Sequence, residues 1–149
     1  MNIASTQYSL KDKSFEIYIS GCREHPCKGC HNPLLWNEDY GELLTQKYLD
    51  EMKLKVKKFN NLINKISIYG GEPLEKPIEE VIWLLKELKQ TNKEIWLFTR
   101  FEINEIQNKI KKYCNYIKTG KYDEAFKTES NIHFGIKLAS SNQKIYKMH

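Results

Sequence analysis

The sequence predicts an α/β protein with a mostly parallel sheet of about five or six strands, arranged as a partial, open (β/α) barrel. Segments rich in aromatic and β-branched residues alternate at least three times with segments of helical apolar spacing. Parallel strands joined by right-handed crossovers produce this alternation. The chain has 149 residues, whereas a closed eight-fold barrel takes about 250. We therefore expect one domain over residues 1–149, with a sheet that does not close on itself.

The first half of the chain predicts three strands and a helix. Residues 5–12 predict a short edge strand and turn, and residues 15–19 (FEIYI) predict a buried strand that ends at a glycine. Residues 41–58 predict a helix, and residues 66–69 predict the second main strand. The helix has one apolar stripe with spacings of four and then three, at Leu44, Tyr48, Met52, Val56 and Phe59.

The second half continues the alternation. Residues 77–90 predict a helix with Pro77 in its first turn, and residues 94–99 predict the third main strand. Residues 113–118 and 131–134 predict two further strands, before the segment SSNQKIY closes the chain. Between the third and fourth strands we expect another helix, whose apolar stripe is Ile103, Ile106 and Ile110.

Composition indicates an ordinary globular protein. Hydrophobic residues make up 40% and charged residues 29%, which is typical of folded domains. No stretch approaches the roughly 20 apolar residues of a membrane span, and the N-terminus lacks a signal-peptide pattern. We therefore expect a cytoplasmic protein without a membrane partner, in a compartment where thiols stay reduced.

The net charge gives no sign of a nucleic-acid partner. It is +5, from 24 Lys+Arg against 19 Asp+Glu. The densest basic run comprises Lys53, Lys55, Lys57 and Lys58. Because no nucleic-acid binding motif accompanies this run, we interpret it as a solvated helix face.

Three of the four cysteines lie close together, at Cys22, Cys27 and Cys30, with the spacing C-x4-C-x2-C. They occupy a Gly/Pro-rich loop over residues 20–36, which follows the first main strand. Three thiols so close cannot all form disulfides, so the group indicates a metal or a cluster. A structural zinc ion takes four ligands, and His25 or His31 would supply the fourth. A four-iron cluster also takes four ligands, so three thiolates leave one iron open. The spacing alone does not separate these two sites.

A second motif is the glycine-rich end of the strand at residues 65–74 (KISIYGGEPL). Backbone carbonyl groups at such a strand end accept hydrogen bonds from an ammonium group, and the missing side chains of Gly70 and Gly71 let a ligand approach closely. The alternative is a tight strand-to-helix turn, with Glu72 placed favourably at the start of the helix.

The cysteine triad, the GGEP motif and the near-terminal SSNQKIY, in this order, resemble the radical S-adenosylmethionine (SAM) superfamily. Within it, GCHNPLLW and SSNQKIY resemble the anaerobic ribonucleoside-triphosphate reductase activating proteins, and the resemblance extends from about residue 15 to 146. It implies a [4Fe–4S] cluster held by Cys22, Cys27 and Cys30, with SAM at the open iron. Many members have three residues between the first two cysteines, whereas this chain has four.

The resemblance also implies cofactor contacts elsewhere. Gly70, Gly71 and Glu72 correspond to the motif that binds the methionyl amino group. His31 stands where the family often has an aromatic residue near the adenine. Thr99 ends the third main strand, where related activases have a polar residue near the amino or carboxylate group of SAM.

Two further positions carry less specific expectations. Arg100 replaces an expected glycine and would pair with the SAM carboxylate, face the partner, or be a surface arginine. Ser140 and Asn142 belong to the SSNQ signature, whose polar groups suit ribose hydroxyls or a peptide backbone. The fourth cysteine, Cys114, is interpreted as a buried and unreactive thiol.

The resemblance therefore implies an enzyme, a radical SAM oxidoreductase that forms a glycyl radical on anaerobic ribonucleoside-triphosphate reductase. Its partners would be the glycine loop of that reductase and a reductant such as flavodoxin or ferredoxin. The first alternative is a radical SAM enzyme acting on a small molecule or another peptide. The second, from a different class, is a zinc-binding interaction module.

Overall fold

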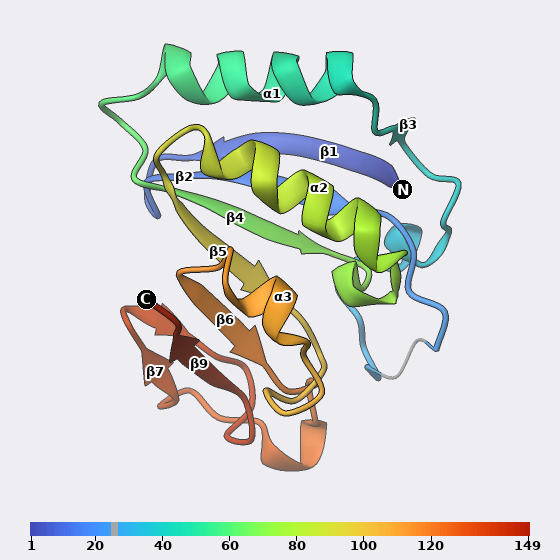
Figure 1. The fold of residues 1–149 in the computed structure, drawn as a ribbon. Helices are drawn as coiled ribbons and strands as arrows, with labels where there is room; N and C mark the ends of the chain where they lie inside the picture. Colours follow the sequence, from blue (N-terminus) through green and yellow to red (C-terminus); the bar gives the residue numbers. More distant parts are fainter. Residues whose placement is uncertain (25–26) are drawn as a thin grey trace.

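The computed structural model describes residues 1–24 and 27–149, and its main feature is a seven-stranded sheet with the order β3-β1-β2-β4-β5-β6-β9 (Figure 1). The strands of this sheet are β1 (Asn2–Ser9), β2 (Ser14–Ile19), β3 (Glu42–Leu43), β4 (Lys65–Gly70), β5 (Glu94–Phe98), β6 (Tyr116–Thr119) and β9 (Lys144–Lys147). Two more strands, β7 (Ile132–His133) and β8 (Ile136–Lys137), form a separate hairpin.

The α-helices are α1 (Gln46–Lys58), α2 (Ile78–Lys89) and α3 (Asn108–Lys111). Three short 3-10 helices are η1 (Pro33–Trp36), η2 (Pro73–Glu75) and η3 (Glu124–Phe126). No helix in the described part of the chain has the length and apolar character needed to cross a membrane.

The predicted partial, open barrel with a mostly parallel sheet is wrong. Only β2, β4, β5 and β6 run parallel to one another, and antiparallel strands flank them on both sides. One reason is that β1 returns to β2 through a tight turn rather than a helical crossover. Another is that α3 has only four residues, so the last crossover adds little to a helical layer. The result is a small α/β fold with a mixed sheet and, in the described residues, three α-helices.

All three α-helices cover one face of the sheet (Figure 1). Alternate residues of the parallel strands point into this core, because successive side chains of a strand face opposite ways. They are Phe15, Ile17, Ile19, Ile66, Ile68, Ile95, Leu97 and Ile117. The helices contribute Leu49, Met52, Val56, Val81, Leu84, Leu85, Leu88 and Ile110.

The opposite face of the sheet carries a row of aromatic side chains near the carboxyl ends of the strands. The rings of Tyr18 and Tyr69 stack with centroids 5.4 Å apart, and Tyr69 contacts Phe98 at 4.2 Å. Lys118 of β6 pairs in register with Phe98 of β5 on one side and with Ile145 of β9 on the other. The helix-free face therefore carries a row of aromatic rings, and Lys118 lies next to the last of them, Phe98.

Three expected elements differ from the structure. The first helix begins at Gln46 rather than near residue 41, because Thr45 caps it by accepting a hydrogen bond from the Tyr48 amide at 3.2 Å. The helix expected around Ile103 and Ile106 exists only as the single turn of α3. The closing segment SSNQKIY, for which no strand was expected, supplies part of β9 to the main sheet.

Candidate cluster and cofactor pocket

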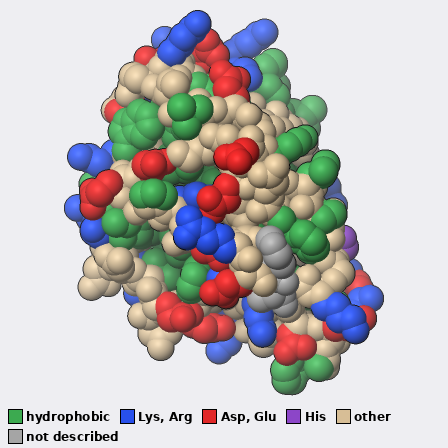
Figure 2. Space-filling model, turned by 90° about the vertical axis from the view of Figure 1, so that its right-hand side faces the viewer, with side chains coloured by type: hydrophobic (Ala, Val, Ile, Leu, Met, Phe, Trp, Pro, Cys, Tyr) green, Lys and Arg blue, Asp and Glu red, His purple; other side chains and the backbone are tan. Residues whose placement is uncertain are grey.

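One pocket of about 270 Å³ contains most of the site residues expected from the sequence. It lies at the carboxyl ends of the parallel strands, where α/β sheets commonly bind ligands. This edge of the sheet faces the viewer in Figure 2, in which acidic and basic side chains are interleaved over the surface. The expected residues that line the pocket are Cys22, Cys27, Cys30, Gly70, Gly71, Glu72, Thr99 and Arg100.

The three cysteines reach this pocket from the loop after β2. Cys22 is buried, and its amide donates to the Trp36 carbonyl at 3.3 Å. Cys27 and Cys30 are half-buried. His25, considered above as a zinc ligand, lies outside the described residues.

The arrangement of these thiols suits a cluster better than a single ion. Within the described residues, no three His, Cys, Asp or Glu side chains are close enough to hold one metal ion together. A single tetrahedral zinc ion requires such convergence. In a four-iron cluster each thiolate binds a different iron, so the thiols only need to surround a common space. Cys22, Cys27 and Cys30 line one pocket, and they would be the ligands of such a cluster.

The glycine loop after β4 is pinned against the cysteine loop through backbone contacts. The Gly71 amide donates to the Ile19 carbonyl at 2.9 Å, and the Glu72 amide donates to the Gly21 carbonyl at 2.7 Å. A Cβ atom on Gly71 would lie 2.3 Å from the Gly21 oxygen and 2.5 Å from the Leu35 oxygen. Only glycine permits this close approach, so the GGEP motif positions the cysteine loop as well as lining the pocket.

The Glu72 carboxylate is occupied by protein donors. One oxygen accepts from the Leu74 amide at 2.9 Å and from the Thr99 hydroxyl at 2.6 Å, and the other accepts from the Arg100 amide at 2.8 Å. Burial raises the pKa of this carboxyl, although the hydrogen bonds oppose the shift. Glu72 thus ties together the loops that follow β4 and β5.

Arg100 is neither a simple surface arginine nor a free cation. Its guanidinium group pairs with Glu75 at 2.6 Å and with Glu24 at 2.8 Å, and its side chain is 16% exposed. Glu75 also accepts a hydrogen bond from the Arg23 amide at 2.7 Å. These contacts connect the cysteine loop, η2 and the loop after β5.

Three expected site residues do not line this pocket. His31 is exposed and borders a different depression together with Lys28 and Tyr122. Ser140 is fully buried, where its hydroxyl accepts from the Asp123 amide at 3.3 Å. The Asn142 side chain donates to the Lys121 carbonyl at 2.9 Å. Ser140 and Asn142 therefore hold the loop after β6 through hydrogen bonds to its backbone.

Several pocket residues were not foreseen as site residues. Tyr69, Phe98 and Lys118 come from the helix-free face of the sheet, and Gln143 comes from the SSNQ segment. Gln143 donates from its amide nitrogen to the Gly120 carbonyl at 3.2 Å. The alternation of strand residues was the available signal, because each of the three lies on the face opposite its buried aliphatic neighbour.

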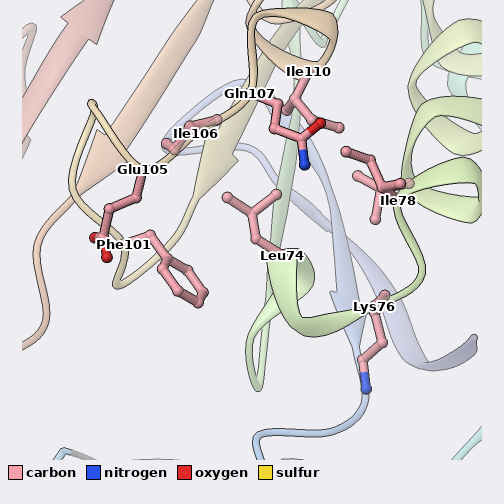
Figure 3. A pocket seen from close by; sticks show the side chains of 9 residues that line it. Leu74, Lys76, Ile78, Phe101, Glu105, Ile106, Gln107 and Ile110 are labelled. Atoms are coloured by element: carbon pink, nitrogen blue, oxygen red, sulfur yellow. The ribbon is translucent and has the colours of Figure 1, made fainter.

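A second cavity of about 250 Å³ lies between η2, α2 and the segment that leads to α3 (Figure 3). It is lined mainly by aliphatic and aromatic side chains, including Leu74, Ile78 and Phe101. None of the three clustered cysteines lines it. We therefore place the candidate site in the cysteine pocket.

Comparison with known proteins agrees with this assignment. Residues 13–146 match the family model of a 4Fe-4S single cluster domain. An anaerobic ribonucleoside-triphosphate reductase-activating protein of Enterobacteria phage T4 is 30% identical over 134 residues, which cover 87% of this chain and 81% of the relative. Proteins of the same name from Escherichia coli K12 and Salmonella typhi are 26% identical over 136 residues, covering 87% of this chain and 85% of each relative. This chain belongs to the 4Fe-4S single cluster domain family, together with the anaerobic ribonucleoside-triphosphate reductase-activating proteins.

Proposed function

We propose that this protein is a radical SAM activating enzyme that generates a glycyl radical on an anaerobic ribonucleoside-triphosphate reductase. The observation that carries the proposal is the shared pocket of the three cysteines and the glycine loop. A cluster ligand set with a vacant iron and a backbone surface for an ammonium group would lie side by side there. The printed names of the relatives supply the target enzyme.

When bound, the cluster would supply one electron to the sulfonium group of SAM. SAM would then split into methionine and a 5′-deoxyadenosyl radical, and this radical would take a hydrogen atom from the target glycine. The residues of this chain bind and orient the reactants. Gly70 and Gly71 would face the methionyl ammonium through their backbone. Glu72 and Thr99 hold that loop in place through their 2.6 Å hydrogen bond.

The aromatic side chains of the pocket would limit the access of water to the radical. Tyr69 and Phe98 line the pocket and contact each other at 4.2 Å. Burial raises the pKa of Tyr69 to about 12, so its phenol stays protonated at neutral pH. No proton transfer is required of the protein in the proposed reaction.

The partners follow from this chemistry. A glycine loop of the reductase would enter the pocket, and a one-electron carrier such as flavodoxin or ferredoxin would reduce the cluster. The face around the pocket has interleaved charges of both signs (Figure 2), which suits recognition of protein surfaces.

The proposal is tested by anaerobic reconstitution with iron and sulfide, followed by addition of SAM, a reductant and the reductase. We expect 5′-deoxyadenosine by chromatography and a glycyl radical by electron paramagnetic resonance. Cys22→Ala, Cys27→Ala and Cys30→Ala should each abolish both signals. Cys114→Ala is the matched control and should retain them, because Cys114 lies in the helix-side core.

The contrary outcomes are distinct. A reconstituted four-iron protein that forms no 5′-deoxyadenosine would reject radical SAM activity. Formation of 5′-deoxyadenosine without a glycyl radical on the reductase would instead indicate a small-molecule or different peptide substrate. Stoichiometric zinc without sulfide in anaerobically purified protein would favour a zinc-binding module.

A further inference from the structure

Lys118 is a half-buried lysine in the cysteine pocket that no sequence motif assigns to a function. It lies in β6 on the helix-free face, in register with Phe98 and Ile145, so both of its neighbours in the sheet are apolar. Its side chain lines the pocket together with Cys22, Cys27 and Cys30. The position therefore places an ammonium group beside the proposed cofactors.

The ammonium group of Lys118 retains binding capacity. Its Nζ donates one hydrogen bond, to the Gly120 carbonyl at 2.7 Å. An ammonium has three donors, and no carboxylate of the described residues forms an ion pair with this one. Burial lowers the pKa of Lys118 to about 8, so the group is still mainly a cation at neutral pH. A partly buried cation with free donors is stabilised by an anionic ligand.

The other basic residues of the pocket are less suited to an incoming anion. Arg100 is already paired with Glu24 and Glu75. Lys121 is exposed to solvent, where an ion pair contributes little. Within the described residues, Lys118 thus combines partial burial with donors that no carboxylate occupies, whereas the guanidinium of Arg100 is held by two glutamates and has only its buried Nε without a partner.

We propose that Lys118 binds the α-carboxylate of SAM and so selects a sulfonium nucleotide that carries an intact amino acid group. The inference rests on the proposed function. Gly70 and Gly71 offer backbone acceptors to the ammonium end of the amino acid, and Lys118 offers donors to its carboxylate end. Recognition of both ends would discriminate against nucleotides that lack either charge.

The test compares SAM with decarboxylated SAM, which keeps the sulfonium, the amine and the nucleoside but lacks the carboxylate. Equilibrium dialysis is performed on reconstituted protein of equal iron and sulfide content. We expect Lys118→Met to weaken SAM binding by about ten- to a hundredfold, because a charge-assisted hydrogen bond is lost. Binding of decarboxylated SAM should change by less than about twofold. Lys118→Arg should largely restore the preference for SAM.

Lys57→Met is the matched control, because Lys57 is an exposed lysine in α1 and does not line the pocket. It should leave both affinities unchanged. An equal loss for the two ligands in Lys118→Met, or no loss for either, would overturn the role of Lys118 alone. Failure of the wild-type reconstituted protein to bind SAM would remove the proposed function and this inference with it.

Discussion

The hydroxyl of Thr99 donates a hydrogen bond of 2.6 Å to the carboxylate of Glu72, and this contact joins the loops after two adjacent parallel strands. The same carboxylate accepts from the Arg100 amide at 2.8 Å. Glu72 is only 1% exposed, so the contact is shielded from water. Two loops that border the cysteine pocket are thereby held at a constant separation.

Removing the Thr99 hydroxyl should destabilise the protein without a large change in volume. We expect Thr99→Val to lower the free energy of unfolding by about 1–3 kcal/mol, because the hydroxyl's hydrogen bond to the buried carboxylate and the one it accepts from the Phe101 amide are both lost. Urea denaturation of the metal-free protein measures this change. Thr99→Ser keeps the hydroxyl and serves as the control, so equal losses in the two variants would contradict the role assigned to the hydrogen bond.

The buried carboxyl of Glu72 should give a characteristic pH dependence of stability. Its pKa in the folded protein is raised above its ordinary value of 4.5 by burial. The folded state therefore binds the proton more tightly than the unfolded state, so its contribution to stability is largest below that value and is lost as the pH rises through the raised pKa.

We accordingly expect the unfolding free energy of wild type, relative to Glu72→Gln, to fall as the pH rises above 4.5, the ordinary pKa of this carboxyl. Urea titrations at several pH values measure the difference. Glu51→Gln removes an exposed carboxylate in α1 and provides the comparison. A difference between wild type and Glu72→Gln that does not vary with pH would show that Glu72 has no raised pKa.

A methyl group on Gly71 should separate the glycine loop from the cysteine loop. The added Cβ would lie 2.3 Å and 2.5 Å from two backbone oxygens. Because both atoms belong to the backbone, a change of side-chain rotamer cannot relieve this clash. We expect Gly71→Ala to lower the unfolding free energy by more than about 2 kcal/mol and to reduce iron bound after reconstitution. Gly135→Ala is the control for iron binding: its Cβ meets nothing within 4 Å, and its φ of +78° makes alanine strained there without any contact with the cysteine loop. Iron retention by Gly71→Ala at the level of Gly135→Ala would disprove this close-packing argument.

Cys114 should remain unreactive while the protein is folded. It is 0% exposed, and burial raises its pKa from the ordinary value of 9.0 to about 12. In metal-free protein at about pH 8, iodoacetamide should modify Cys27 and Cys30 rapidly and Cys114 only after denaturation, because the thiolate is the nucleophile. Peptide mass spectrometry resolves the sites. Modification of Cys114 in folded protein at the rate of Cys27 would refute its burial.

The sequence alone predicted the order of the main strands and indicated a metal or a cluster at the cysteine loop. The buried strands near residues 15–19, 66–69 and 94–99 correspond to β2, β4 and β5, because aromatic and β-branched runs have a strong local preference for strands. The cysteine spacing and the GGEP motif are likewise local patterns. Because β2 and β4 run parallel, the loops that carry these two patterns lie at the same edge of the sheet.

Tertiary structure decided which strands flank the parallel ones and which side chains meet in the pocket. The antiparallel pairing of β9 with β6 depends on hydrogen bonds between segments that are distant in the chain, and that of β1 with β2 depends on the tight turn at residues 10–13 between them. Tertiary structure also decided which hydrogen-bond and ion-pair partners the polar residues of the pocket have. Glu72 is tied to Thr99, Arg100 is paired with two glutamates, and Lys118 is left with free donors, because each outcome depends on groups brought together from distant segments.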